Sequence, residues 1–238
     1  MRKIKNTDIL KQPCFMNKIK AVIFDMDGTI IDTESSWKQI KKDFLLKQGI
    51  KTINSKQQMA LEQVSSAGLL ITLSVMKKEF GLSKSIEILL KEKNQIANNH
   101  FEQKYINFID GFQDFHEKLK QKNILTSIAT NANIQFLNLL NKKIKLDKYF
   151  GKNMYTMEHV NNKAKPDPAV FLHSAKKLSV NPQECIIFED SLVGFNAAKA
   201  AGIKCIAIKN KYNSHILHHA DGMIENYHQA EEAIEKIA

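Results

Sequence analysis

Short apolar runs, each stopped by polar or turn-forming residues, occur once near the start of the chain and repeatedly in its second half. Residues 21–24, 124–129, 185–188 and 203–208 form such runs, rich in β-branched or aromatic side chains. Runs of this length and composition are typical of strands buried in a parallel sheet. Segments with helical spacing lie between them. The pattern predicts an α/β fold, a doubly wound parallel sheet with helices on both faces.

Apolar residues between positions 33 and 109 recur at helical spacing, with few strand signals. One amphipathic helix is predicted to end at Gly49, and its apolar residues are Trp37, Ile40, Phe44 and Leu45. A second apolar stretch spans 59–80, interrupted at 65–68. A third spans 85–108 and keeps its apolar face as far as Tyr105 and Phe108. Three such segments predict a small helical bundle.

These patterns divide the chain into three parts. Residues 1–19 are polar, carry lysines and contain Pro13, so we predict an N-terminal extension. Residues 20–32 and 110–238 are predicted to form the α/β core domain. Residues 33–109 are predicted to form an all-helical domain inserted into that core.

The composition fits a globular chain without a dedicated macromolecular partner. The 238 residues are 43% hydrophobic, which is enough to bury a full core, and the net charge is +10. The lysines are spread over predicted helix faces and no nucleic-acid motif accompanies them, so we expect no nucleic-acid partner. A mild positive field would instead attract small anions.

Location and assembly are predicted from what the sequence lacks. No stretch approaches the ~20 apolar residues of a membrane helix, and the N-terminal residues do not form the continuous apolar region of a secretory signal. Cys14, Cys185 and Cys205 have no metal-binding spacing and suit a reducing compartment. We therefore expect a cytoplasmic monomer that does not bind membranes.

Two carboxylates follow the first predicted strand, in the motif Asp25-Met26-Asp27-Gly28-Thr29. Ligands of parallel sheets bind beyond the carboxyl ends of the strands. An Asp side chain there can attack phosphorus and form an acyl phosphate, and a second Asp two residues later can move a proton to or from the ester oxygen. Two carboxylates beside a phosphate dianion repel it, so we expect Mg²⁺. The alternative is an ordinary strand-to-turn junction.

Three later segments place polar residues where the same site needs them. Thr130 and Asn131 follow a predicted strand and precede a helix, where a hydroxyl and free N–H groups can hold an anion or merely cap the helix. A lysine directly before Pro166 is held extended and can reach inward. Glu189 and Asp190 end another strand and can bind a metal or cap the helix that starts near Ser191.

In this order, the motifs resemble those of the haloacid dehalogenase-like (HAD) superfamily, in its phosphatase and β-phosphoglucomutase-like branch with a helical cap. The resemblance rests on the first motif, on Lys165-Pro166, and on Phe188-Glu189-Asp190-Ser191 followed by Gly194 and Ala200-Ala201-Gly202. It implies a Rossmann-like HAD core, with Asp25, Asp27 and Lys165 as catalytic residues. Lys163 is the competing lysine, but it does not precede a proline.

The resemblance also implies the ligands of the site. Thr130, Asn131 and Lys165 would bind phosphate. Mg²⁺ would be bound by Asp25, Asp27 through its main-chain carbonyl, Glu189 and Asp190. The helical domain would close over the substrate, with Glu34 and Trp37 nearest the hinge, although the spacing of Trp37 is more typical of bundle core.

The predicted function is Mg²⁺-dependent hydrolysis of a small phosphomonoester, such as a sugar phosphate, through an aspartyl-phosphate. One alternative is a β-phosphoglucomutase-like sugar-phosphate mutase. Mutases of this branch carry a basic residue in the cap loop that corresponds to 65–72, and none is present there. The other alternative is a non-enzymatic binding protein on the same fold.

Overall fold

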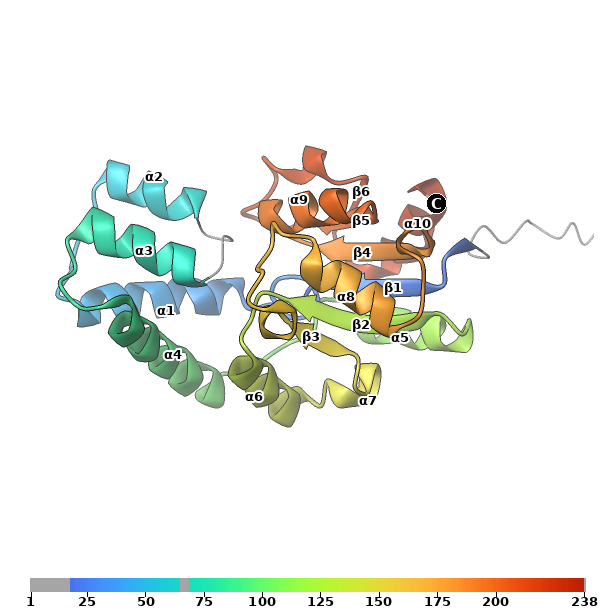
Figure 1. The fold of residues 1–238 in the computed structure, drawn as a ribbon, viewed down its shortest axis with the longest axis horizontal. Helices are drawn as coiled ribbons and strands as arrows, with labels where there is room; N and C mark the ends of the chain where they lie inside the picture. The colour runs from blue at the N-terminus through green and yellow to red at the C-terminus, as the bar shows by residue number, and fades with distance from the viewer. Residues whose placement is uncertain (1–17, 65–68, 238) are drawn as a thin grey trace, which may run out of the picture.

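The computed structural model describes residues 18–64 and 69–237, and its centre is one parallel six-stranded sheet (Figure 1). The strand order is β3-β2-β1-β4-β5-β6. The strands are β1 (Ala21–Phe24), β2 (Leu125–Thr130), β3 (Met154–Thr156), β4 (Cys185–Glu189), β5 (Lys204–Ile208) and β6 (Gly222–Ile224). Phe24 is in register with Ile128 on one side and Phe188 on the other. The carboxyl ends of β1, β2 and β4 therefore meet at one edge, which brings the predicted motifs together.

Helices cover both faces of this sheet. They are α5 (Phe112–Gln121), α6 (Ile134–Ile144), α7 (Asp147–Phe150), α8 (Ala169–Lys177), α9 (Leu192–Ala201) and α10 (Ala230–Ile237). Alternate strand residues belong to two separate apolar clusters: Phe24 packs with α5 and α10, whereas Ile23 packs with α8 and α9. A parallel sheet buried on both faces in this way confirms the predicted doubly wound fold.

Phe24 is the centre of an aromatic cluster beneath the carboxyl edge of the sheet. Its ring lies 5.5 Å from that of Phe188 and 5.7 Å from that of Phe112, measured between centroids. Tyr227, which is also buried, joins this cluster, and its hydroxyl donates to the main-chain oxygen of Thr29 at 3.0 Å. The cluster therefore supports the loop that follows β1 from below.

Residues between β1 and α5 form four helices that lie to one side of the sheet (Figure 1). These are α1 (Glu34–Lys47), α2 (Ser55–Gln63), α3 (Leu69–Phe80) and α4 (Ile86–Gln103). They have a small apolar cluster of their own, which includes Phe44, Leu73 and Leu89. We call these four helices the cap. The predicted interruption at 65–68 lies outside the described residues.

The segment after α4 corrects the sequence prediction. The helix ends at Gln103; Tyr105 is 82% exposed, and Phe108 stacks on Phe112 of the core instead of continuing the bundle face. The reason is backbone pairing between the two connections of the cap. The N–H of Asp32 donates to the oxygen of Asn107, and that of Ile109 donates to the oxygen of Ile30. The segment that enters the cap and the segment that leaves it are therefore hydrogen-bonded to each other, at 30–32 and 107–109, and we call these two segments the paired hinge.

The described helices include none that combines the length and hydrophobicity needed to cross a membrane.

The aromatic cluster predicts a large effect of one substitution. Phe24→Ala should lower the free energy of unfolding by about 3–5 kcal/mol, because it leaves a cavity among rings that cannot collapse together. Urea denaturation measures this. Met223→Ala is the control: its side chain is 55% exposed, so a change of about 0.5 kcal/mol or less is expected. Similar losses for both variants would contradict the packing argument.

Candidate active site

Lys165 lies at the centre of the charged groups at the carboxyl edge of the sheet. Its ammonium is 2.6 Å from Oδ1 of Asp25 and 2.9 Å from Oε1 of Glu189, and its side chain is only 1% exposed. Lys163, the competing lysine, is exposed. The structure therefore brings Lys165, and not Lys163, to the two acids.

Asn131 fixes the main chain at Lys165. Its Oδ1 accepts from the Lys165 N–H at 2.8 Å, and its Nδ2 donates to the Lys165 carbonyl at 3.3 Å. The Nδ2 group has a second N–H that this bond does not use. Thr130 is buried, lines the cavity described below, and accepts from the N–H of Ala132 at 3.1 Å. Thr130 and Asn131 both line this cavity, and phosphate binding by either side chain stays a prediction.

Glu189 is held by two kinds of donor. While Oε1 contacts Lys165, Oε2 accepts from the N–H groups of Asp190 and Ser191, both at 2.6 Å. Gly194 makes room for this carboxylate, since a Cβ there would lie 1.9 Å from it. The sequence identified Gly194 only as part of the motif that follows Ser191. Its specific role depends on a contact that no local pattern reveals.

Asp190 packs against the loop that carries Asp27. Gly28 has φ +76°, and a Cβ at this position would lie 2.1 Å from Oδ2 of Asp190. The same oxygen accepts from Nδ2 of Asn210 at 3.2 Å, and the Asp190 carbonyl accepts from Nδ2 of Asn213 at 2.9 Å. These two asparagines follow β5, at the same sheet edge as the predicted motifs. Sequence reasoning missed them, and their position after a strand was the available signal.

Asp27 is held by residues at the start of the cap. Its Oδ1 accepts from the Thr33 hydroxyl at 2.8 Å and from the indole N–H of Trp37 at 2.9 Å. The Trp37 ring also packs on Phe101 of α4 and Phe136 of α6. Trp37 therefore contributes both to packing, as predicted, and to the site, while Thr33 was missed. Thr33 and Trp37 lie four residues apart, on one face of the first cap turn.

Buried negative charge exceeds buried positive charge at this site. Burial raises the pKa of Asp25 to about 7 although Lys165 opposes the shift, and burial together with Glu189 raises that of Asp190 well above its usual range. Burial also raises the pKa of Asp27. For Lys165, burial disfavours the charge, but Asp25 and Glu189 outweigh it and raise the pKa. One lysine facing four carboxyl groups leaves a site that a cation would stabilise.

The residues expected to bind Mg²⁺ differ in how many of their oxygens are already engaged. Across 18–64 and 69–237, no three His, Cys, Asp or Glu side chains converge on a ready metal-binding point. In Glu189, Oε1 contacts Lys165 and Oε2 accepts from two amides. Asp25, Asp190 and the main-chain carbonyl of Asp27 remain as oxygen donors of the hard type that Mg²⁺ prefers, with water completing the shell. In chemistry and charge these residues fit the ion. Oε1 of Glu189 has one contact, with Lys165, and keeps a lone pair, so its role as a ligand stays a prediction.

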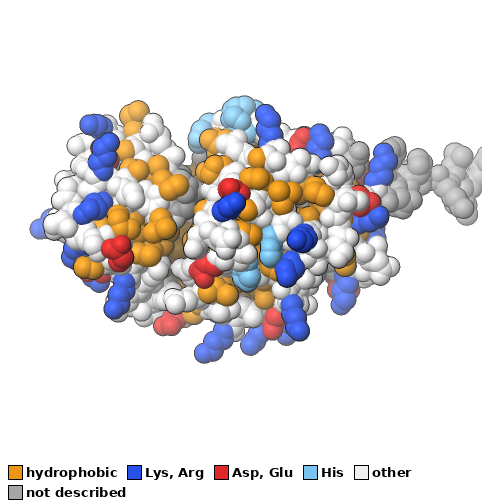
Figure 2. All heavy atoms as spheres, in the orientation of Figure 1, with side chains coloured by type: hydrophobic (Ala, Val, Ile, Leu, Met, Phe, Trp, Pro, Cys, Tyr) orange, Lys and Arg blue, Asp and Glu red, His pale blue; other side chains and the backbone are white. Residues whose placement is uncertain are grey.

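A cavity of about 800 Å³ connects this site with the cap. Figure 2 shows the hollow between the two parts of the molecule. Asp25, Thr130 and Lys165 line it from the core. Glu34, Trp37 and residues of α3 and α4 line it from the cap. A ligand bound at Asp25 would therefore be enclosed by side chains from both parts.

The family is decided by a comparison with known proteins: a family model described as haloacid dehalogenase-like hydrolase matches residues 22–208. The chain belongs to the haloacid dehalogenase-like hydrolases. A phosphorylated carbohydrates phosphatase from Thermotoga maritima is 27% identical over 188 residues, covering 79% of this chain and 84% of that protein. Together these findings confirm the predicted HAD-like family and the predicted enzyme class, a phosphoric monoester hydrolase.

Solved structures agree on the HAD fold. A HAD hydrolase from Entamoeba histolytica superposes with a TM-score of 0.79 at 21% identity, covering 91% of this chain and 99% of that chain. A β-phosphoglucomutase from Clostridium difficile gives 0.74 at 24% identity, covering 92% and 96%. At 21% and 24% identity these similarities show the fold alone, so the reaction has to be inferred from the residues of the site.

The surplus charge predicts how stability depends on pH and on metal. Asp25 has a higher pKa in the folded chain than its ordinary value of about 4, so its contribution to stability is lost as pH rises toward about 7. With EDTA, the free energy of unfolding should therefore fall between roughly pH 5 and pH 8. Excess MgCl₂ should reduce this loss, because the cation binds the deprotonated groups. Urea unfolding at pH 5 and at pH 8 measures the free energy of unfolding under each condition. An equal loss of free energy between the two pH values with EDTA and with Mg²⁺ would contradict the prediction.

Proposed function

We propose that this HAD hydrolase is a Mg²⁺-dependent phosphatase that hydrolyses a small phosphorylated metabolite through an aspartyl-phosphate. The observation that carries the proposal is the buried contact between the Asp25 carboxylate and Lys165 at the floor of the cavity. A carboxylate next to a fixed ammonium can attack an anionic phosphoryl group whose charge would otherwise repel it. The phosphatase from Thermotoga maritima supports a phosphorylated carbohydrate as the type of substrate.

The first step transfers the phosphoryl group to the enzyme. An Asp25 oxygen forms a bond to phosphorus while the bond from phosphorus to the ester oxygen breaks. Asp27 gives its proton to that leaving oxygen, and its raised pKa allows it to hold the proton beforehand. Lys165 balances charge on Asp25 and on the transferring group, and the Thr130 hydroxyl would donate to a phosphoryl oxygen.

The second step releases phosphate. Asp27, now deprotonated, takes a proton from a water molecule that attacks phosphorus, and the bond between phosphorus and Asp25 breaks. Thr33 and Trp37 keep the Asp27 carboxylate oriented through both steps. When bound by Asp25, Asp190 and the Asp27 carbonyl, Mg²⁺ would neutralise negative charge between the nucleophile and the phosphoryl group.

The cap would exclude bulk water and contact the leaving group. We propose the domain division expected from the sequence, with the paired hinge at Asp32 and Ile109 as the boundary. Hydrolysis is favoured over the mutase reaction because the sequence has no basic residue between positions 65 and 72, where mutases of this branch carry one. The complete set of Asp25, Asp27 and Lys165 in one cavity favours an enzyme over a binding protein.

Replacing the nucleophile tests the mechanism. Asp25→Asn should reduce hydrolysis of p-nitrophenyl phosphate by roughly four orders of magnitude or more, because the amide cannot form the acyl phosphate. Phosphate release and circular dichroism measure activity and fold. Asp114→Asn, an exposed acid on α5, is the matched control and should behave as the parent. Activity near the parent level in Asp25→Asn would overturn the assignment, and an isomerised sugar phosphate instead of free phosphate would identify a mutase.

Removing the indole donor tests the role of Asp27. Trp37→Phe removes a hydrogen bond that lowers the pKa of Asp27, so that pKa should rise. With an alkyl phosphate, whose leaving group needs the proton, the alkaline limb of the pH profile of kcat/KM should move up by about one unit or less. Phe101→Leu, which alters the ring that packs on Trp37 but no donor to Asp27, should leave the limb in place. An unmoved limb in Trp37→Phe would argue against Asp27 as the acid.

A further inference from the structure

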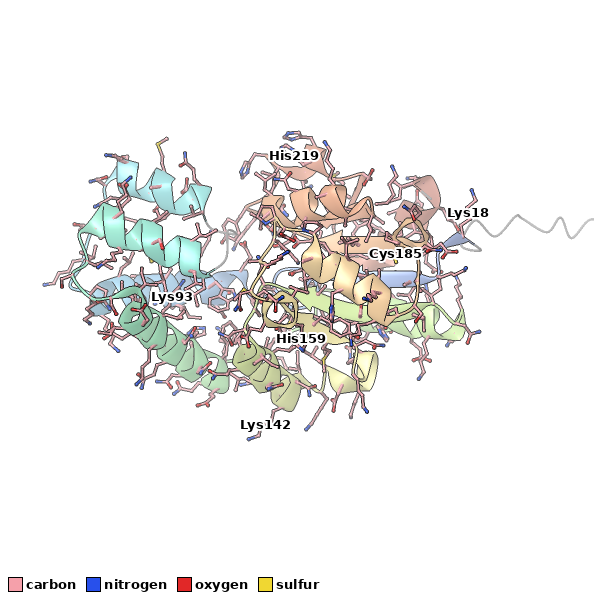
Figure 3. The ribbon with its side chains drawn as sticks, viewed as in Figure 1. Lys18, Lys93, Lys142, His159, Cys185 and His219 are labelled. Carbon is pink, nitrogen blue, oxygen red and sulfur yellow. The ribbon has the colours of Figure 1, made fainter. Side chains whose placement is uncertain are left out.

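The connection between β5 and β6 begins beside Asp190, and the proposed mechanism assigns it no task. It spans residues 209–221 and includes His219, which is labelled in Figure 3. Its first part, 209–213, carries Asn210 and Asn213, whose side chains both contact Asp190. We call residues 209–213 the asparagine loop. Because Asp190 is one of the residues that fit a cation, the way this loop holds Asp190 affects the cation site.

Asn213 fixes the asparagine loop to the sheet, and its residue is only 5% exposed. Its Nδ2 donates to the carbonyl of Ile208, the last residue of β5, at 2.8 Å, and to the carbonyl of Asp190, which follows β4, at 2.9 Å. Its Oδ1 accepts from the N–H of Asn210 at 2.9 Å. One buried amide therefore joins the loop to the carboxyl ends of two paired strands.

Asn210 holds the side chain of Asp190. Its Nδ2 donates to Oδ2 of Asp190 at 3.2 Å, and its Oδ1 accepts from the N–H of Tyr212 at 2.8 Å. The second bond is the turn bond that asparagine commonly makes to the residue two positions later, and it fixes the direction of the amide. The same Oδ2 faces Gly28, where a Cβ would lie 2.1 Å from it. The carboxylate is therefore fixed in its rotation about the Cβ–Cγ bond.

This fixed rotation favours cation binding. The last torsion of an aspartate side chain is broad, so an unsupported Asp190 would have to be ordered when a cation binds. Glu189 and Asp25 also repel its negative charge and favour orientations away from them. A donor on Oδ2 stabilises the ionised carboxylate in place and leaves Oδ1 for a cation. Groups that orient metal ligands in this way typically contribute about 10- to 100-fold in metal affinity.

The asparagine loop also contacts the cap. The Nζ of Lys38 on α1 lies 2.9 Å from the centre of the Tyr212 ring, an arrangement in which the ring attracts the ammonium. This contact uses the side chain of Tyr212, whereas Asn210 accepts from its main-chain N–H. The two contacts can therefore be removed separately, and this makes the role of Asn210 testable.

We propose that Asn210 is a positioning residue that orients the Asp190 carboxylate for Mg²⁺ and raises the affinity of the site for this ion. Asn213 acts one step further away, because it holds both the Asn210 N–H and the Asp190 carbonyl. The inference rests on the proposed Mg²⁺ site and deepens it. It assigns a task to a loop that lies outside the motifs on which the family resemblance rests.

Magnesium affinity tests the assignment. Titration calorimetry of the full chain with MgCl₂, without substrate, gives the Kd of the ion. Asn210→Ala should raise this Kd by roughly 10- to 100-fold. Asn210→Ser should raise it similarly, because a serine hydroxyl can keep the turn bond to Tyr212 but is too short to reach Asp190. This second variant supplies the test if the alanine variant does not fold. An unchanged Kd in the folded variants would overturn the proposal.

Two control variants separate orientation of the carboxylate from packing of the loop. Tyr212→Leu removes the ring beneath Lys38 but keeps the N–H that Asn210 accepts. Asn226→Ala removes the same kind of turn bond, to the N–H of His228, in the segment after β6. Both controls should keep the parent's Kd for Mg²⁺. Equal increases in Tyr212→Leu and Asn210→Ala would indicate a general loss of loop structure and would overturn the assignment to Asn210.

Kinetics at varied Mg²⁺ concentration separate this inference from the proposed mechanism. In Asn210→Ala, the Mg²⁺ concentration for half-maximal hydrolysis of p-nitrophenyl phosphate should rise with the Kd, while the rate at saturating Mg²⁺ should recover toward that of the parent. If Asp25→Asn remains active while Asn210→Ala weakens Mg²⁺ binding, the mechanism fails and the positioning role stands. If Asp25→Asn is inactive and Asn210→Ala binds Mg²⁺ as the parent does, the positioning role fails and the mechanism stands.

Discussion

The contact of Lys165 with Asp25 and Glu189 is the constraint on which the site depends. An ammonium this deeply buried is tolerable only if anions surround it, and anions this deeply buried are tolerable only with cations near them. Much of the nearby structure serves this balance. Asn131 fixes the main chain of the lysine, and Gly194 leaves space for the carboxylate of Glu189. The far oxygen of Glu189 is held by the amides of Asp190 and Ser191, which directly precede α9.

The parts of the fold with regular spacing could be predicted from the sequence. The runs that became β1, β2, β4 and β5 were recognisable because a strand buried on both faces is apolar throughout. Strands β3 and β6, of three residues each, were missed because so short a segment has no periodicity. The prediction extended the helix that became α4 too far, to Phe108, because that phenylalanine continues the apolar spacing although it packs on the core.

The candidate site shows the same limit. Asp25, Asp27, Glu189 and Asp190 were predicted to share one site because the carboxyl ends of parallel strands lie together. Lys165 follows no strand directly, and it was selected by the family resemblance and its position before Pro166. Sequence reasoning could not assign partners among them. Three contacts depend on side-chain positions in three dimensions: Glu189 faces Lys165, Asn131 holds a main chain, and Trp37 donates to Asp27.

The bond from Tyr227 to the carbonyl of Thr29 joins the last part of the chain to the loop of the first motif. The two bonded residues are 198 positions apart in the sequence, so the loop gains this support only when both halves of the sheet have come together. Local unfolding of the segment around Tyr227 would therefore also release the loop that carries Asp27, although the two segments are far apart in the chain.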